Sequence, residues 1–176
     1  MYGGGIVVKR ENPSPSQVAQ MKAKELLINA IRCVRWSYYE DGILKVTDCR
    51  DRTHPVTEDY IETTYKTRNW GSMYTSQWSM ELGINTKWWY NHTREERLVL
   101  IVHELTHIKH PHHKPEFWDS MIQNLKDIAE SNEFQLLDWD KVADMAERDP
   151  NSNCVDRRCE TVSERKRKMR KVKDFR

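Results

Sequence analysis

The fold is decided by a stretch with the pattern of one amphipathic helix, residues 93–108, TREERLVLIVHELTHI. Thr93 and Glu96 match a capping box, in which the two side chains bond backbone N–H groups at a helix start. The apolar residues behind it recur at helical spacing and predict one buried face. They are Leu98, Ile101, Val102, Leu105 and Ile108. Pro111 predicts that the helix ends within a few residues of His107.

His103 and His107 are four residues apart, so they lie one above the other on this helix. At about 100° per residue they fall roughly 140–180° from the apolar face, and we expect them to point out of the core into a cleft. Two imidazoles so placed can hold one Zn²⁺, and Glu104 can take a proton from a water on the metal. The alternative is a helix with two solvated histidines, which leaves the glutamate between them unexplained. The pattern therefore predicts a zinc hydrolase, most simply a peptidase.

A catalytic zinc site usually has three protein ligands and one open position. His113 is the preferred third ligand because Pro111 turns the chain before it. Its spacing of six residues from His107 also equals the interval found in metzincins. The remaining candidates are His110, His112 and Glu116.

Four motifs in a fixed order resemble a known family. They are RNWGS at 68–72, LGIN at 82–85, VHELTH at 102–107 and HKPEFW at 113–118. Together they are similar to the YgjP-like metallopeptidase domain, which is related to the SprT-like and WLM groups of zinc proteases. The resemblance covers roughly residues 45–130. It implies that His103, His107 and His113 bind zinc, with Glu104 as the catalytic acid and base.

The order of the predicted elements indicates an α+β fold, and the resemblance implies a zincin-like one. We expect an N-terminal helix, a small antiparallel sheet of about three strands, the HExxH active-site helix and a backing helix. The first helix begins near Ser14 or Ser16, and an Asp41-Gly42 turn precedes the sheet. The candidate strands are residues 43–46, 60–65 and 78–84, and the later helices start at Pro115 and cover residues 140–148.

The resemblance also implies where a substrate binds. Residues 79–85 would form the sheet edge that receives an extended peptide by strand addition. Gly83 would let another backbone approach, or would mark a plain bulge or twist. Trp70-Gly71-Ser72 could shape the wall of the cleft. The candidates for stabilising the oxyanion are Tyr90, Arg68 and Tyr74.

Composition predicts one soluble domain with appendages. Of the 176 residues 38% are hydrophobic and 32% charged, and no apolar run approaches the roughly 20 residues that span a bilayer. We expect a flexible lead over residues 1–15, the metallopeptidase domain over 16–148, and a basic, disordered tail over 149–176. Four scattered cysteines form no disulfide framework, and residues 1–10 lack a signal-peptide core. These features favour an intracellular, cytoplasmic protein with free thiols.

Charge is distributed unevenly along the chain. The net charge is +2, yet residues 157–176 contain ten Lys and Arg against three Asp and Glu. Such a run attracts nucleic acid by neutralising phosphates, or is a solvated terminus with no partner. The expected partners are therefore a protein or peptide substrate and, as a candidate, nucleic acid through residues 157–176, but no membrane.

Two alternative functions remain open at this stage. One is a SprT-like, DNA-associated protease recruited through the basic tail. The paired Cys-x-x-Cys units of the SprT-like zinc ribbon are missing, since Cys154 and Cys159 form a single Cys-x₄-Cys pair. The other is a non-catalytic, zinc-stabilised binding module. Glu104 argues against it, because a structural zinc site closes its fourth position and needs no base.

Overall fold

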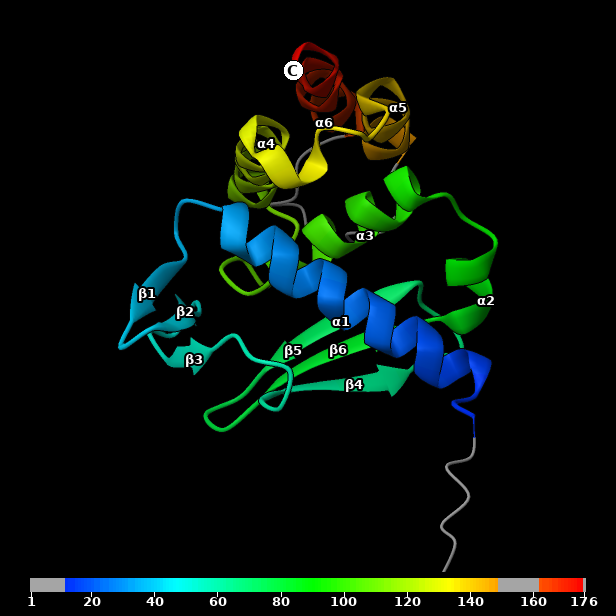
Figure 1. Ribbon diagram of the computed structural model, residues 1–176. Helices are drawn as coiled ribbons and strands as arrows, with labels where there is room; N and C mark the ends of the chain where they lie inside the picture. Colours follow the sequence, from blue (N-terminus) through cyan, green and yellow to red (C-terminus); the bar gives the residue numbers. More distant parts are fainter. Residues whose placement is uncertain (1–11, 149–161, 176) are drawn as a thin grey trace, which may run out of the picture.

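The computed structural model describes residues 12–148 and 162–175 of the chain. Helices α1 and α3 lie on one face of a three-stranded sheet, and α4, α5 and α6 form a further layer beyond α3 (Figure 1). The elements are α1 Pro15–Cys33, β1 Tyr38–Glu40, β2 Ile43–Thr47, β3 Thr53–Pro55, β4 Ile61–Tyr65, β5 Gly71–Thr75, β6 Met80–Ile84, α2 Thr86–Tyr90, α3 Arg94–Thr106, α4 Pro115–Glu130, η1 Asn132–Phe134, α5 Trp139–Arg148, α6 Val162–Met169 and η2 Arg170–Asp174. The α+β class and the N-terminal helix expected from the sequence are confirmed.

The first helix, α1, begins where the sequence predicts. Ser14 is its N-cap, Pro15 occupies the first turn, and Ser14 and Gln17 form a reciprocal capping box. Its inner face is narrow at Ala19 and Ala23, which are fully buried. The helix packs on α3 and α2 and lies over β4 and β6.

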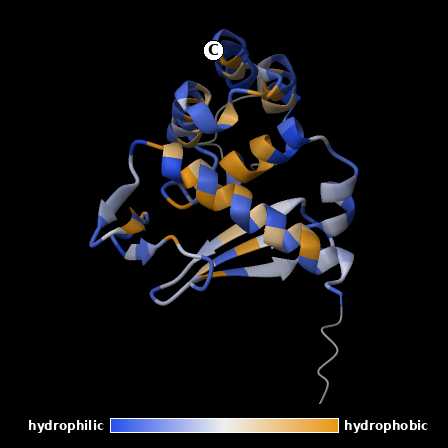
Figure 2. Ribbon diagram, in the orientation of Figure 1, coloured by the Kyte–Doolittle hydropathy of each residue, from blue (hydrophilic) through white to orange (hydrophobic). Residues whose placement is uncertain are grey.

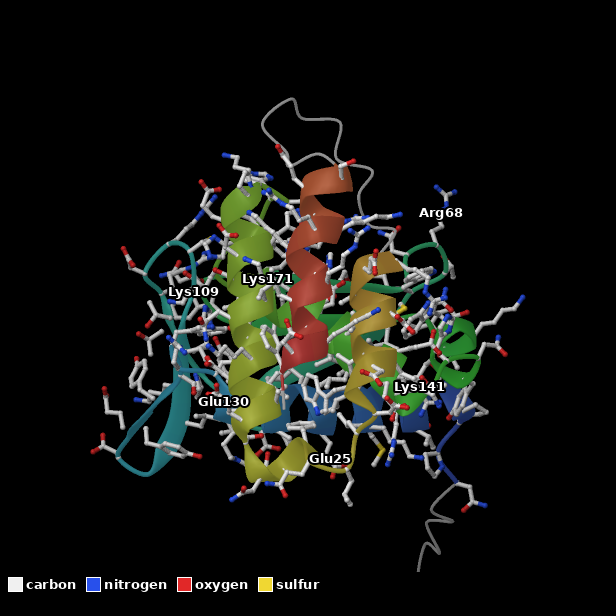
Figure 3. All side chains as sticks on the ribbon, turned by 90° about the horizontal axis from the view of Figure 1, so that it is seen from above. Glu25, Arg68, Lys109, Glu130, Lys141 and Lys171 are labelled. Carbon is white, nitrogen blue, oxygen red and sulfur yellow. The ribbon has the colours of Figure 1, made fainter. Side chains whose placement is uncertain are left out.

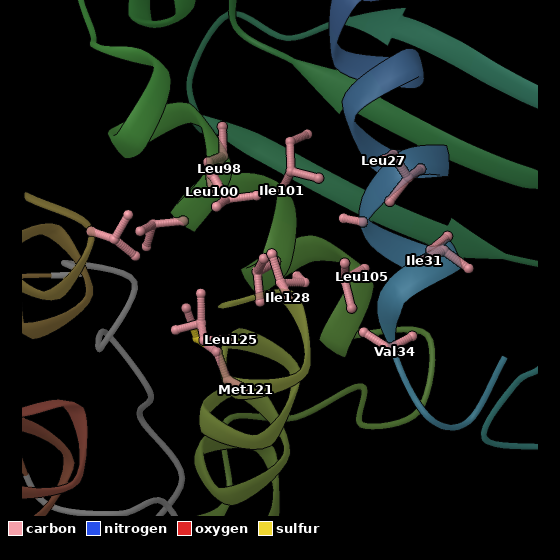
Figure 4. Close-up of a cluster of buried hydrophobic side chains, with 14 of the residues drawn as sticks. Leu27, Ile31, Val34, Leu98, Leu100, Ile101, Leu105, Met121, Leu125 and Ile128 are labelled. Atoms are coloured by element: carbon pink, nitrogen blue, oxygen red, sulfur yellow. The ribbon is translucent and has the colours of Figure 1, made fainter. Parts of the chain in front are cut away.

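The main core lies between α1, α3 and α4. Figure 4 shows apolar side chains of these three helices meeting in one cluster. The labelled members are Leu27, Ile31, Val34, Leu98, Leu100, Ile101, Leu105, Met121, Leu125 and Ile128. Hydrophobic residues extend over most of α3 (Figure 2), and every residue from Leu98 to Thr106 is buried. The predicted polar side of this helix is therefore covered by α4 instead of facing solvent.

The small antiparallel sheet contains β1, β2 and β3 in that order. The predicted strand at residues 43–46 is its central strand, and the predicted turn before it is present. Asp41 and Gly42 both have positive φ, 53° and 76°, as a tight two-residue hairpin turn requires. A three-stranded antiparallel sheet is thus confirmed, although the other two predicted strands do not belong to it.

Those two strands, β4 and β6, form a second sheet together with β5. Its order is β4-β6-β5, with β4 parallel and β5 antiparallel to β6. The prediction that residues 79–85 are a sheet edge is therefore wrong, because β6 is central. Four of its five residues are buried, as a strand paired on both sides requires. The edge on the α3 side is β5, which contacts that helix.

The end of the chain differs from the expected disordered tail in the part that the structure describes. Residues 162–175 form α6 and η2, which pack against α4 and α5. Arg165, Met169 and Val172 recur at helical spacing and are all buried. The composition is dominated by charges, yet this one stripe is buried where the segment packs on its neighbours. The exposed cations Lys166, Arg167 and Lys171 are termed the basic face below.

Other expectations concern the termini, the cysteines and the membrane. Residues 1–11 of the predicted lead and 149–161 of the predicted tail lie outside the described residues, as do Cys154 and Cys159. Cys33 and Cys49 are free thiols. None of the helices in residues 12–148 and 162–175 combines the length and apolar content needed to cross a bilayer.

Candidate active site

Three histidines converge at the C-terminal end of α3. His103 lies in its last turn, His107 caps the helix, and His113 follows in the turn that leads into α4. The Nε2 atom of His103 lies 3.2 Å from Nε2 of His107 and 3.0 Å from Nε2 of His113. All three ligand atoms lie within 4.8 Å of one another, so the cluster could hold a metal ion.

The donor set fits a zinc ion. Tetrahedral coordination at Zn–N distances of 2.0–2.1 Å places ligand nitrogens about 3.3 Å apart, close to the two separations above. Nδ1 of His107 lies 2.9 Å from the backbone carbonyl of His110. Because a carbonyl only accepts, Nδ1 must carry the proton, and the lone pair of the neutral ring is at Nε2, which is directed at the cluster. Three imidazoles, with no thiolate, are a donor set that a catalytic zinc commonly has.

Aromatic side chains of α4 form one wall of the site. Pro115 starts this helix, which places Phe117 and Trp118 in its first turn, both buried. The Phe117 ring lies 4.6 Å from His107 and 4.9 Å from both His103 and His113, measured between ring centroids. His103 is consequently only 2% exposed. The imidazole cluster is partly closed by α4, whereas the helical pattern alone indicated an open cleft.

Glu104 lies beside His103 on α3 and is buried against strand β5. Its side chain packs on Gly71, where an added Cβ would lie 3.2 Å from the Glu104 Oε1 atom and 3.3 Å from its Cγ. The same Cβ would lie 3.2 Å from the Gly83 carbonyl oxygen. An added methyl group would therefore fit only if the carboxylate or the strand moved by a few tenths of an ångström. The predicted wall residues 70–72 do lie at the site, through Gly71.

The free edge of β5 borders the site. The ladder with β6 bonds Asn85 N–H to the Trp70 carbonyl, and Ser76 N–H to the Ser79 carbonyl. Since the groups of an antiparallel strand alternate in direction, Gly71 and Met73 direct their N–H and C=O groups away from β6. The next outward carbonyl, that of Thr75, accepts a hydrogen bond from Arg52 at 3.2 Å. The open backbone edge therefore begins beside Glu104 and ends at Arg52.

The other sequence candidates for the third ligand lie elsewhere. His112 and Glu116 are exposed. The His110 ring forms a 2.7 Å hydrogen bond with the Ser120 hydroxyl, and burial lowers its pKa. Only its backbone carbonyl reaches the cluster, through His107. Sequence reasoning missed this contact because a main-chain group leaves no signal in the residue type.

The candidates for stabilising an oxyanion are not brought to the cluster. The Tyr90 hydroxyl donates to the carbonyl of Pro15, at the start of α1. Tyr74 is 72% exposed and alternates with Gly71 along β5, so it lies on the outer face of the sheet. Arg68 extends away from the body of the protein (Figure 3).

A buried polar cluster fixes Arg52 at the end of this edge. Asp48 accepts from the Arg52 Nε atom at 2.7 Å and lies 2.8 Å from Nε2 of His54. The other ring nitrogen of His54 lies 2.7 Å from the Tyr60 hydroxyl. Burial by itself would raise the pKa of Asp48, but the bonds from His54 and Arg52 outweigh it and hold this pKa well below its usual range. Sequence analysis did not identify this cluster, whose members are scattered along residues 48–60.

Comparison with known proteins supports the resemblance seen in the motifs. A sequence model of the family described as YgjP-like, metallopeptidase domain, matches residues 8–134, which is more than half of the chain. Searches among curated proteins and among solved structures returned no match. The matched range includes α1 to η1, and therefore the three histidines, Glu104 and β5, and it ends before α5 and α6.

Proposed function

The chain belongs to the YgjP-like metallopeptidase family, and from this premise we propose that it is a zinc-dependent peptidase with a zincin-like fold. His103, His107 and His113 would hold one Zn²⁺, and Glu104 would act as general base and then as general acid. The observation that carries the proposal is the convergence of three imidazole nitrogens at the end of α3, where the residue that follows His103 is a buried glutamate.

The chemistry divides between the metal and the chain. When bound, zinc would supply a Lewis acid that lowers the pKa of a coordinated water to about 7 and polarises the scissile carbonyl. Glu104 accepts the proton of the attacking water and later delivers it to the departing amine nitrogen. Gly71, which has no side chain, leaves the space that this carboxylate occupies. The His110 carbonyl holds the His107 ring in the tautomer that presents Nε2.

The substrate would be an extended polypeptide segment that pairs with β5. Gly71 and Met73 offer outward N–H and C=O groups, which is the pattern that strand addition uses. Arg52 occupies the Thr75 carbonyl, so pairing on this side is limited to a few residues. Such a segment must be free of strand partners of its own, so unfolded or flexible chain is the expected substrate class.

The alternatives are less well supported. A zinc-stabilised binding module has no use for Glu104, a buried carboxylate that follows His103 directly on α3. A DNA-associated protease needs free cations on the tail. Of the described cations in α6 and η2, Lys168, Arg170 and Lys173 form ion pairs with α4 and α5. Among the cations of residues 162–175, nucleic-acid binding would therefore rest on the basic face, and binding through residues 157–176 stays a prediction.

The test compares the wild type with Glu104→Gln and, as a matched control, Glu116→Gln. Each purified protein is assayed for bound zinc by mass spectrometry and for cleavage of unfolded casein. We expect zinc in all three, and at least about a hundredfold slower cleavage by Glu104→Gln alone. Equal cleavage by Glu104→Gln and the wild type would remove the catalytic assignment. Absence of zinc from all three proteins would remove the metal site.

A further inference from the structure

The C-terminal segment α6–η2 lies between α4 and α5 and contacts both helices (Figures 1 and 3). It begins well beyond residue 134, where the match to the family ends. The candidate metal site is described fully by residues before that point, so this segment is an addition to the matched domain. Its contacts with α4 nevertheless bring it close to the site.

The segment is docked by apolar and ionic contacts together. Met169 and Val172 are fully buried, and Arg165 is 3% exposed. Ion pairs join the segment to both neighbouring helices. They are Lys168 to Asp119 at 2.7 Å, Arg170 to Glu147 at 3.1 Å and Lys173 to Asp144 at 3.8 Å. Burying a guanidinium carries a desolvation cost. If packing were the whole purpose of this helix, an apolar side chain at position 165 would avoid that cost.

The buried guanidinium reaches the metal site through one aromatic ring. The Cζ atom of Arg165 lies 5.2 Å from the centre of the Trp118 ring. The Trp118 ring is stacked on His113, with centroids 5.7 Å apart and planes inclined by 23°. It also contacts His103 at 5.9 Å. Arg165, Trp118 and His113 therefore form a continuous series of ring contacts from α6 to the third histidine.

We propose that Arg165 is a positioning residue for the metal site. It attracts the Trp118 ring by a cation–π contact in a desolvated environment, where such contacts are strongest. The ring so fixed keeps the His113 imidazole turned toward His103. This matters most for His113, because it lies on a turn, whereas His103 lies on a helix and His107 caps it. The inference rests on the proposed zinc site, but not on peptidase activity.

The test measures zinc retention in Arg165→Met and Arg165→Gln. Arg165→Lys restores a cation, and Lys168→Met is the matched control because it removes a docking contact of the same helix without touching the ring series. Zinc affinity is measured by competition with a chromogenic chelator, and site geometry by the visible spectrum of the cobalt-substituted protein. Thermal unfolding of the metal-free proteins measures docking separately.

We expect Arg165→Met and Arg165→Gln to bind zinc roughly tenfold more weakly, the usual effect of losing an outer contact to a metal ligand. Arg165→Lys should recover most of this affinity, and Lys168→Met should lower thermal stability with zinc affinity nearly unchanged. Wild-type zinc affinity in either folded Arg165 variant would overturn the proposal, as would an equal loss in Lys168→Met. A wild type that binds zinc but cleaves nothing would refute the proposed function and leave this inference standing.

Discussion

The contact between Gly71 and Glu104 allows a sharp test of how the sheet positions the general base. In Gly71→Ala the new methyl group would lie 3.2 Å from the carboxylate oxygen and 3.2 Å from the Gly83 carbonyl. The strand backbone is held by its ladder on one side, so the Glu104 side chain must move by a few tenths of an ångström. The metal ligands are not touched by this change.

The size of the effect follows from the displacement. A misplacement of about 1 Å at a catalytic group costs about a hundredfold in rate. A few tenths of an ångström therefore predict a loss in kcat/KM of about tenfold or somewhat less, which is about 1 kcal/mol of transition-state stabilisation. The free energy of unfolding should change by no more than about 1 kcal/mol, because alanine restricts the unfolded chain more than glycine does.

Ser72→Ala is the matched control, because it changes the next residue of β5, whose side chain lies on the opposite face of the sheet from Glu104. It removes only a hydroxyl group and brings no atom toward the carboxylate. Peptidase assays, zinc analysis and urea unfolding should show reduced kcat/KM with full zinc content in Gly71→Ala only. Wild-type activity in Gly71→Ala, or an equal loss in Ser72→Ala, would refute the reasoning that β5 positions Glu104.

Three further predictions concern the metal ligands, the polar cluster and the basic face. His113→Ala should lower zinc affinity far more than His112→Ala, because only the former removes a nitrogen of the cluster; chelator competition measures this, and a reversed order would exclude His113 as a ligand. Asp48→Asn should lower the free energy of unfolding by about 3 kcal/mol at pH 7, because it leaves buried partners unmatched. The pKa of Asp48 is depressed in the folded state, so its stabilisation is present above the pKa of the unfolded chain, about 4, and is lost as the pH falls further. Urea titrations should therefore show the gap between wild type and Asp48→Asn narrowing below about pH 4, and a gap independent of pH would contradict this. Replacing the three residues of the basic face by alanine should make the slope of log K for DNA binding against log salt concentration less steep by roughly two to three. A wild type that binds no DNA at low salt would remove this partner.

The sequence predicted the elements of the site better than their arrangement. The capping box of Thr93 and Glu96 and the apolar repeat after it depend on near neighbours, so the start of α3 could be located without tertiary information. The pairing of His103 with His107 follows from the same helical period. The prediction of three ligands extends this to His113, which the turn after Pro111 does bring within reach of the other two rings.

The parts that could not be predicted depend on contacts between distant residues. The residue pattern correctly predicted strands within residues 60–65 and 78–84. The alternation of side chains along a strand does not show which other strands pair with it. For this reason the central strand β6 was predicted to be an edge. The amphipathic pattern of α3 did not reveal that α4 covers its polar side through Phe117. The charge of the tail concealed the stripe that docks α6, because composition averages over the faces of a helix.

The way in which Arg52 covers the Thr75 carbonyl has a consequence for solubility. A bare β-strand edge invites a second molecule to pair along its whole length, and such pairing leads to aggregation. Here the Arg52 guanidinium bonds the outward carbonyl of Thr75. Along β5 this leaves the outward N–H and C=O groups of Gly71 and Met73 to pair with another chain. Under the proposed function the run from Gly71 to Met73 would pair with the substrate, and its short length disfavours pairing with a second copy of the chain.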